Sequence, residues 1–447
     1  MSSVPANSLI MVDQQSSLAT LKLIPPIVFQ SRRSACALAL LAAAVAYAQG
    51  QAPAPLTWEQ VKQKFIAANP TLMAGQINID ESKAQEITAF LRPNPNFTIS
   101  TDQIQPIPSG APYRPFTYAF PSIVFDYLHE RQHKRELRLQ SQKDATAIAV
   151  SQQADQERTL LFNLRTAFVG TLQAKKQLDL AVVNRDYFDK EYVISQQRYQ
   201  AGDIAQMDLQ RIHLQRPQYE QDYETALVNL RTAKITMLML LNARTPIDQF
   251  DVDGKFDFDE TMGPLEQFHD IALAERPDLR AALQAVDKAQ ADHRLAVANG
   301  STDPTFSVDF GRNPPITFYF GMGINIPLRI FDRNQGEKLR TEIDIRHAER
   351  LKDSTQAQVF SDVDSAYFTV LGVLNQLKPY KTTYLQEATD VRDKVSFAYQ
   401  RGGAALVDFL DAQRDYRAVQ LEYVTLIGSY LTAAGQLNMA VGREVVQ

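Results

Sequence analysis

Cysteine is almost missing from this chain of 447 residues, in which Cys36 is the single example. One cysteine cannot form a disulfide within the chain, so stability must come from packing or from the association of several chains. Cys36 follows an Arg-Ser-Ala tripeptide and not the leucine-rich approach of a lipidation site. We therefore expect neither cross-links nor a lipid anchor.

A surplus of positive charge is missing as well. Lysine and arginine number 46 against 51 aspartate and glutamate residues, which leaves a formal net charge of -5 at pH 7. A chain without a basic surplus has little with which to neutralise phosphate groups, so we expect no nucleic-acid partner. The 45% hydrophobic and 22% charged residues are typical of a folded protein.

Long hydrophobic runs are also absent. The apolar run from Ala35 to Val45 has about 11 residues, whereas a membrane-spanning helix needs roughly 20. Two arginines precede this run, and Ala46-Tyr47-Ala48 follows it as an A-x-A cleavage signal. Residues 1–48 are therefore predicted to be a signal peptide. The stretch before the arginines is longer than usual, which leaves the true start codon open.

Most enzyme motifs are missing too, since the chain has no phosphate-binding glycine loop, no nucleophile elbow and no C-x-x-C pair. The exception is H-E-x-x-H at residues 129–133, whose histidines would bind zinc from one face of a helix in a metalloprotease. Its flanks are charged, whereas the catalytic helix of such an enzyme is buried. We predict a solvated helix start, and neither an enzyme nor a metal or cofactor. Zinc-dependent proteolysis, with Glu157 as a third ligand, is the alternative.

What the chain does contain is an internal repeat. The segment Tyr199–Gly202, followed by Asp208, recurs 200 residues later as Tyr399–Gly402, followed by Asp408. An N-P-T-L segment that begins at Asn69 has an R-P-D-L counterpart further along. Such self-similarity indicates a duplication. The predicted domains are a first repeat at 49–245, a linker at 246–265 and a second repeat at 266–447.

Each repeat contains one very long helix. In the second repeat, apolar residues alternate by three and four positions, as in the seam of a coiled coil. They are Phe360, Val363, Tyr367, Val370, Leu374 and Leu377. The predicted helices run from Arg131 to Gln200 and from Asn334 to Gln400. The first has about 70 residues and would extend roughly 105 Å, which no compact domain needs. A soluble coiled coil is the alternative.

Two strands precede each long helix, at about 95–126 and 304–330. Apolar and polar residues alternate from Thr317 to Leu328, with weaker counterparts in the first repeat. These counterparts are Phe97, Ile99, Phe116, Tyr118 and Phe120. The lengths approach the 9 to 11 residues of a membrane strand. A half-buried sheet in a soluble domain would show the same alternation.

Four strands cannot close a barrel by themselves. Every backbone amide in lipid must be paired, so such a chain must take strands from other copies of itself. Two copies would supply eight strands and three copies twelve, and the pattern does not choose between them.

Two motifs resemble the TolC family of outer membrane efflux proteins. The pattern Tyr399-x-x-Gly402-x5-Asp408-x2-Asp411-Ala412-Gln413 is similar to the family signature at the periplasmic tip. The P-L-R-I-F-D-R-N-Q-G segment that begins at Pro327 resembles the cobalt-zinc-cadmium branch. The resemblance covers essentially the whole mature chain in both repeats.

This resemblance implies a mainly α fold with membrane β, in which a coiled-coil α-helical barrel joins a twelve-stranded β-barrel. Each chain of a homotrimer would contribute four strands to that barrel, in the outer membrane. The implied function is the exit duct of a tripartite efflux pump that carries heavy-metal cations and extends into the periplasm. Its partners would be a periplasmic adaptor, an inner-membrane RND-type pump and outer-membrane lipid. A type I secretion duct or a soluble periplasmic scaffold are the alternatives.

The two tips, at about 201–205 and 401–405, are predicted to be interhelical turns, because glycine tolerates the left-handed backbone that such turns need. The resemblance adds that an adaptor packs there. The residues assigned to this contact are Gly202, Asp203, Arg401, Gly402 and Gly403.

The resemblance also places an acidic gate after the second tip. Asp408 and Asp411 lie three residues apart and so share one helical face. Under threefold symmetry each would form an acidic ring that favours cations. Tyr399 and Asp208 correspond to a latch between the tips. Some relatives have an arginine where this chain has Ala404, so Arg401 would have to replace it. Stabilisation of the helix N-terminus is the other role open to Asp408.

Overall fold

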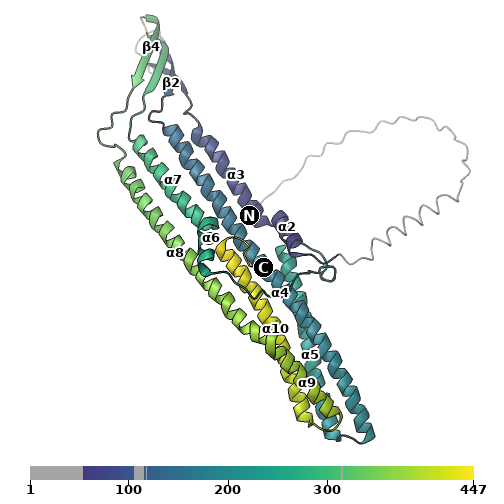
Figure 1. The fold of residues 1–447 in the computed structure, drawn as a ribbon. Helices are drawn as coiled ribbons and strands as arrows, with labels where there is room; N and C mark the ends of the chain where they lie inside the picture. The colour runs from purple at the N-terminus through teal and green to yellow at the C-terminus, as the bar shows by residue number, and fades with distance from the viewer. Residues whose placement is uncertain (1–53, 105–114, 117, 314–315, 447) are drawn as a thin grey trace, which may run out of the picture. The chain divides into compact units, whose positions relative to one another are not determined.

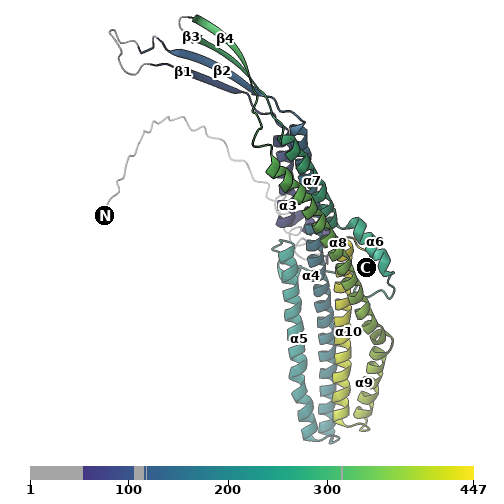
Figure 2. The same ribbon diagram turned by 90° about the vertical axis from the view of Figure 1, so that its left-hand side faces the viewer.

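The computed structural model describes residues 54–104, 115–116, 118–313 and 316–446. The predicted signal peptide lies outside these residues. Within residues 54–446, helices run side by side and a four-stranded sheet extends from one end of them (Figures 1 and 2). None of the described helices is long and apolar enough to cross a membrane.

Both repeats contain the same order of elements. In the first repeat the helices are α2 (Trp58–Ala68), α3 (Pro70–Phe90), α4 (Lys134–Ala201) and α5 (Gln206–Leu240). In the second they are α6 (Leu265–Glu275), α7 (Pro277–Asn299), α8 (Gln335–Pro379), α9 (Leu385–Gln400) and α10 (Leu406–Val441). Short helical turns occupy Ile247–Gln249 and Tyr380–Tyr384.

The break between the first two helices lies before a proline in each repeat. Asn69 ends α2 and caps α3, because its Oδ1 accepts hydrogen bonds from the N–H groups of Thr71 (2.9 Å) and Leu72 (3.1 Å). Pro70 then opens α3, where a missing N–H costs nothing. In the second repeat Arg276 and Pro277 occupy the corresponding places between α6 and α7.

The strands are β1 (Asn96–Asp102), β2 (Phe120–Leu128), β3 (Thr305–Asn313) and β4 (Ile316–Asn325), all antiparallel in the order β1-β2-β3-β4. Their register aligns apolar residues on one face, for example Phe97, Phe125, Val308 and Met322. The next row, on the opposite face, contains Asn96, Asp126, Ser307 and Gly323. The predicted alternation is therefore a two-faced sheet.

The apolar face is the more open one. Met322 is 77% exposed on that face, whereas Ser122 and Gly311 on the polar face are buried. Among the described residues, β1 and β4 each pair with one strand only. Each edge strand of this sheet therefore presents backbone groups that a further strand could pair.

Two strand predictions were wrong in their limits. Phe116 and Tyr118 precede β2 and lie outside it, because aromatic alternation does not distinguish a strand from the turn before it. β4 ends at Asn325 and not at Leu328. Pro327 follows, and proline has no N–H to donate to the next strand.

The long helix of the first repeat has 68 residues and follows the prediction closely. The second is interrupted by a π turn, Tyr380–Tyr384, between α8 and α9. The expectation of one regular helix was wrong here because Pro379, just before the turn, lacks the N–H that would continue the hydrogen-bond ladder. Pro217, by contrast, lies inside α5, which continues past it.

The predicted heptad seam forms the largest hydrophobic core. Val363, Val370, Leu374 and Leu377 are at most 2% exposed and pack with α10. Phe360 and Tyr367 of the same seam are half-buried. A separate cluster lies near the tips and contains Phe188, Ile212, Tyr219, Tyr399, Leu406 and Phe409.

Candidate functional site

The two predicted tips are interhelical turns at the end of the helices opposite the sheet (Figure 2). Gly202 (φ 84°) and Gly402 (φ 76°) adopt the left-handed backbone that the turns require. The N–H of Asp203 closes the first turn by donating to the Arg198 carbonyl over 2.8 Å. The N–H of Gly403 does the same to the Ala398 carbonyl, also over 2.8 Å. The two turns therefore share one geometry.

Asp408 and Asp411 lie on the exposed face of α10. Phe409 and Ala412, on the opposite face, are buried. Asp408 Oδ2 accepts a hydrogen bond from the Ala405 N–H over 3.3 Å, so this carboxylate also caps the helix. Asp411 forms an ion pair with Arg414 at 3.1 Å. The two carboxylates face solvent together within one chain.

Tyr399 is 4% exposed, and its ring stacks on Phe409 with the centroids 4.9 Å apart. Arg198, from α4, donates a hydrogen bond to the Tyr399 carbonyl over 2.8 Å and lies 5.1 Å from its ring centroid. Burial raises the pKa of the Tyr399 hydroxyl, so it stays protonated. That hydroxyl faces Ser195 without a hydrogen bond of normal geometry. The ring and carbonyl therefore make the contact between repeats.

The other latch candidates lie apart from this contact. Arg401 stacks on Phe397 of its own helix at 4.5 Å. Asp208 is half-buried, and its charge is near enough to favour the protonated form of Tyr399. Arg198 is a residue that sequence reasoning missed. The available signal was an asymmetry of the repeats, because Ala398 stands 200 positions later.

A second polar contact joins the repeats one turn away. Gln400 Nε2 donates to both oxygens of Glu191, at 2.9 and 3.2 Å. Glu191 is 5% exposed. Burial raises the pKa of its carboxyl, against the opposing effect of the hydrogen bonds from Gln400. The sequence carries no sign of this, because a glutamate in a long helix usually faces water.

Further contacts fix the α9–α10 hairpin on the α4–α5 hairpin. The Tyr187 hydroxyl donates to Ser396 Oγ over 3.1 Å. Gln413 Nε2 donates to the same oxygen over 3.1 Å. Arg417 of α10 forms an ion pair with Asp222 of α5 at 3.2 Å. The tips of one chain are thus held together by polar contacts around an aromatic cluster.

Replacing Glu191 by glutamine should make the protein more stable at neutral pH and leave it unchanged near pH 4. Folding raises the pKa of Glu191, so the free energy of unfolding falls as the pH rises from the ordinary 4.5 through the raised value. Glutamine does not ionise, so this loss of stability disappears, and its amide oxygen can still accept a hydrogen bond from Gln400. Thermal unfolding of the detergent-solubilised protein at several pH values measures the effect. Glu387→Gln, an exposed change on α9, is the control; equal midpoints for Glu191→Gln and the parent at all pH values would contradict the prediction.

The H-E-x-x-H motif does not form a zinc site. His133 has a left-handed backbone (φ 54°), its side chain is 87% exposed, and α4 begins only at Lys134. The two histidines therefore do not share a helical face. Glu130 is paired with Arg138. Among the described residues no group of three histidine, cysteine, aspartate or glutamate side chains could hold a metal ion. The prediction of a solvated helix start holds for His133, whereas Lys134, the first residue of α4, is buried against Asp303.

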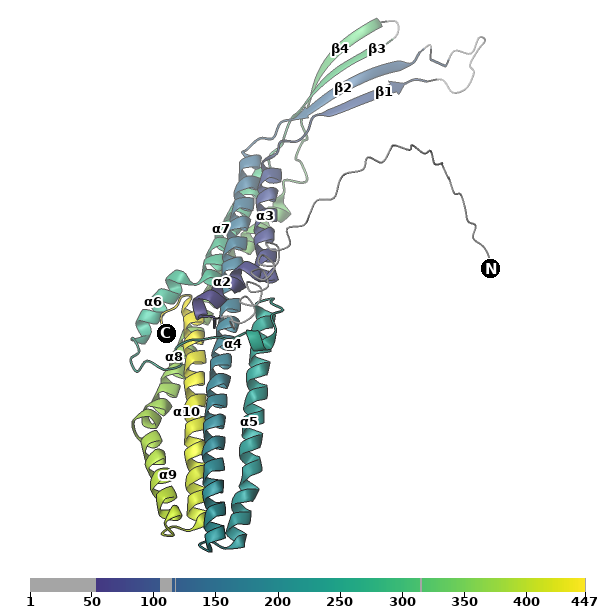
Figure 3. The ribbon, with the colours of Figure 1, turned by 90° about the vertical axis from the view of Figure 1, so that its right-hand side faces the viewer.

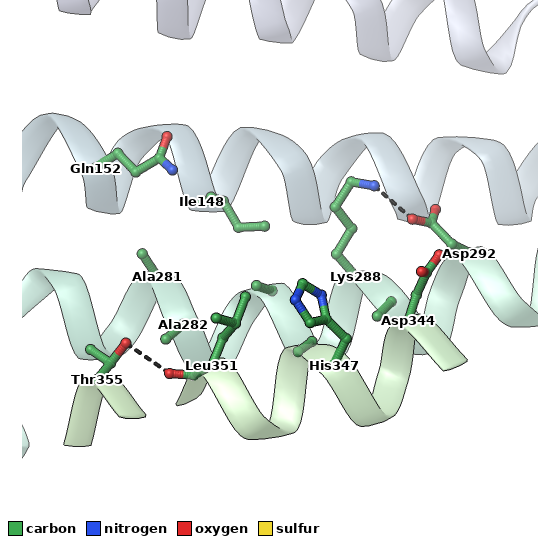
Figure 4. Close-up of a pocket in the computed structure, with 13 residues that line it drawn as sticks. Ile148, Gln152, Ala281, Ala282, Lys288, Asp292, Asp344, His347, Leu351 and Thr355 are labelled. Carbon is green, nitrogen blue, oxygen red and sulfur yellow. Dashed lines mark hydrogen bonds and ion pairs between the residues drawn. The ribbon is translucent and has the colours of Figure 1, made fainter. Parts of the chain in front are cut away.

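A groove of about 500 Å³ lies between α4, α7 and α8, above the tips (Figure 4). Alanines such as Ala281 and Ala282 form much of its lining. Lys288 and Asp292 form an ion pair in it at 2.6 Å, and His347 extends toward it from α8. Small side chains and a neutralised pair give the groove little with which to recognise a substrate.

Comparison with known proteins agrees with this geometry. The family model of the outer membrane efflux protein matches residues 269–443. The cobalt-zinc-cadmium resistance protein CzcC of Cupriavidus metallidurans is 23% identical over 409 residues, which are 88% of this chain and 91% of CzcC. The outer membrane protein TolC of Escherichia coli is 21% identical over 334 residues, which are 69% of this chain and 66% of TolC.

Solved structures show the same fold. A structure of CusC covers 86% of this chain and 92% of its own, with a TM-score of 0.72 and 16% identity. The outer-membrane channel OprN covers 86% of this chain and 89% of its own, with a TM-score of 0.71 and 15% identity.

Proposed function

The chain belongs to the TolC family of outer membrane efflux proteins, and we propose that it is the duct through which a tripartite pump passes heavy-metal cations from the periplasm to the exterior. It is an outer-membrane efflux channel that resembles the heavy-metal branch, and its relatives are channels and not enzymes. The direction and the cations are the part that we propose.

The observation that carries the proposal is the incomplete sheet. In the part of the chain that the structure describes, β1 and β4 each have one edge without a partner strand, and the exposed face of the sheet is apolar. Three copies would pair these edges and close twelve strands, with lipid outside and the polar face inside. Members of the family act as trimers with a periplasmic adaptor and an inner-membrane RND pump, and we assign this chain the same partners.

Two observations support metal cations as the solute. The segment that begins at Pro327 resembles the heavy-metal branch, and CzcC, a cobalt-zinc-cadmium resistance protein, aligns along most of its length. Asp408 and Asp411 face solvent at the tip, where their charge would attract cations. A relative named for pyoverdine export, OpmQ of Pseudomonas aeruginosa, shows that the solute must be tested directly. Growth of a deletion strain in cobalt, zinc or cadmium should fall and recover with the intact gene; unchanged growth in all three would remove metals as the solute.

A bulky residue at the second tip should reduce efflux while the channel still reaches the outer membrane, because an adaptor would no longer fit there. Substitutions at Gly402 and Gly403 distinguish the effect of added bulk from the effect of backbone strain. Any side chain at Gly402 is strained by its φ of 76°, whereas a Cβ at Gly403 would meet the Ala398 carbonyl at an ordinary 3.6 Å. Gly403→Trp therefore adds bulk, and Gly402→Ala adds strain. Resistance and the amount of channel in outer membranes are measured for both; full resistance with Gly403→Trp would speak against docking at this tip.

A further inference from the structure

The segment that joins the two repeats, residues 250–264, crosses both of them and is called the strap here. Near its start, Asp251 forms ion pairs with Lys175 of α4 at 2.6 Å and Lys234 of α5 at 3.3 Å. Burial raises the pKa of Asp251, but the two lysines outweigh it and hold that pKa below its usual range. The strap is therefore anchored on the first hairpin by an ionised carboxylate.

The other end of the strap is fixed on the second repeat. Phe258 is 4% exposed in the large core and meets the ring of Tyr430 with the centroids 6.0 Å apart. The Tyr430 hydroxyl accepts from the Asp259 N–H at 3.3 Å. Glu260 then forms an ion pair with Lys381 at 3.0 Å, and the Lys381 ammonium lies 4.8 Å from the Phe258 ring centroid. The hydrogen bond with Glu260 raises the pKa of Lys381, which stays charged.

Lys381 belongs to the π turn, a place where the two repeats differ. α4 runs unbroken for 68 residues, whereas the turn separates α8 from α9. Above the turn α8 packs on α6, α7 and α10; below it α9 packs on α10 and reaches α4 through the polar contacts near the tip. The helix path changes direction there (Figures 2 and 3). A π turn inside a long helix is frequently found at a functional site.

We propose that the π turn is a hinge on which α9 moves, and that the ion pair between Glu260 and Lys381 locks it. The strap is held at Asp251 on the first hairpin, which is α4 and α5. The ion pair between Glu260 and Lys381 therefore couples the hinge of the second hairpin, α9 and α10, to the first hairpin. Both partners are about half exposed, at 43% for Lys381 and 54% for Glu260. An exposed pair is weak and is screened by salt, which suits a contact that must open. The inference rests on the proposed duct and adds a control point away from the tips.

The experiment is single-channel recording of the purified full-length channel in planar bilayers. Lys381→Gln and Glu260→Gln should each raise the mean conductance in about 0.1 M salt by roughly two- to fivefold, because each removes the lock. The charge exchange Glu260→Lys with Lys381→Glu should restore the parental value. Lys378→Gln, an exposed change just before the turn, is the matched control and should leave the conductance unchanged. In about 1 M salt the parent and both single variants should converge.

Parental conductance in Lys381→Gln at low salt, or no recovery in the charge exchange, would overturn the lock. A parent whose conductance is the same at both salt concentrations after correction for bulk conductivity would overturn it too. These outcomes differ from failure of the proposed function, in which the parent protein itself would form no pore.

Discussion

Replacing Arg276 by alanine should lower the free energy of unfolding by about 2–3 kcal/mol, somewhat less than the loss of a fully buried ion pair costs. Arg276 is 3% exposed and binds Asp278 at 2.6 Å, Asp362 at 2.9 Å and the Ala440 carbonyl at 3.2 Å. Burial lowers the pKa of Arg276, but the two carboxylates outweigh it, so the guanidinium stays charged. Its loss would leave Asp362 without an ion pair and Asp278 with only the guanidinium of Arg158, 4.0 Å away, where α6, α7, α8 and α10 meet. Asp362 keeps 36% of its side chain exposed, which reduces the cost.

The first repeat supplies a matched control for this variant. Asn69 and Thr71 occupy the places that Arg276 and Asp278 occupy in the second repeat. The double change Arg276→Asn with Asp278→Thr removes one of the two carboxylates and introduces a capping residue, so it should recover part of the loss. Thermal unfolding of the solubilised channel compares the three proteins. An Arg276→Ala midpoint equal to the parent's would show that the junction is held by packing alone.

The ion pair between Arg276 and Asp278 also predicts that the difference in stability between the parent and Arg276→Ala depends on pH. Burial raises the pKa of Asp278, but Arg276 outweighs it and holds the pKa below the ordinary 3.8. The stabilisation is therefore present above pH 3.8 and is lost as the pH falls through the lowered value. The difference between the thermal unfolding midpoints of the parent and Arg276→Ala should therefore become smaller at acidic pH.

Most of the fold could be predicted because its signals are local and repeated. The heptad seam around Val363 and Val370 follows from spacing alone, and glycine at 202 and 402 marks the tips. The π turn could not be predicted with equal ease. A proline inside a helical pattern can bend a helix, interrupt it or be tolerated, and Pro379 and Pro217 differ in this respect.

The site divides in the same way. Asp408 and Asp411 could be placed on one exposed face from their spacing, because helix geometry fixes that relation. Arg198 and Glu191 act on residues about 200 positions away, so their roles depend on how the two hairpins pack. A contact of that kind has no periodic signal, and only the asymmetry between Arg198 and Ala398 hinted at it.

In the proposed duct, charge and closure at the second tip would rest on different residues, so they could be changed separately. Asp408 and Asp411 make no contact with the first hairpin in the described residues; their partners are the Ala405 N–H and Arg414. Arg198, by contrast, holds the Tyr399 carbonyl and ring from the first hairpin. We therefore expect ion selectivity to depend on the two carboxylates, and conductance to depend on Arg198.

Replacing both Asp408 and Asp411 by alanine should reduce the cation-to-anion permeability ratio by roughly tenfold or more. Each carboxylate attracts a monovalent cation at about 6 Å by about 0.7 kcal/mol even in bulk water, and three chains would lose six of them. Arg414 would lose its ion pair with Asp411 and keep the one with Asp415, so the local charge would become more positive. Arg198→Met should instead raise the conductance and keep the parental ratio. Reversal potentials and conductances in planar bilayers separate the two effects, and Glu422→Ala, an exposed change further along α10, should alter neither. A parental permeability ratio in the double variant would show that neither carboxylate contributes to the gate.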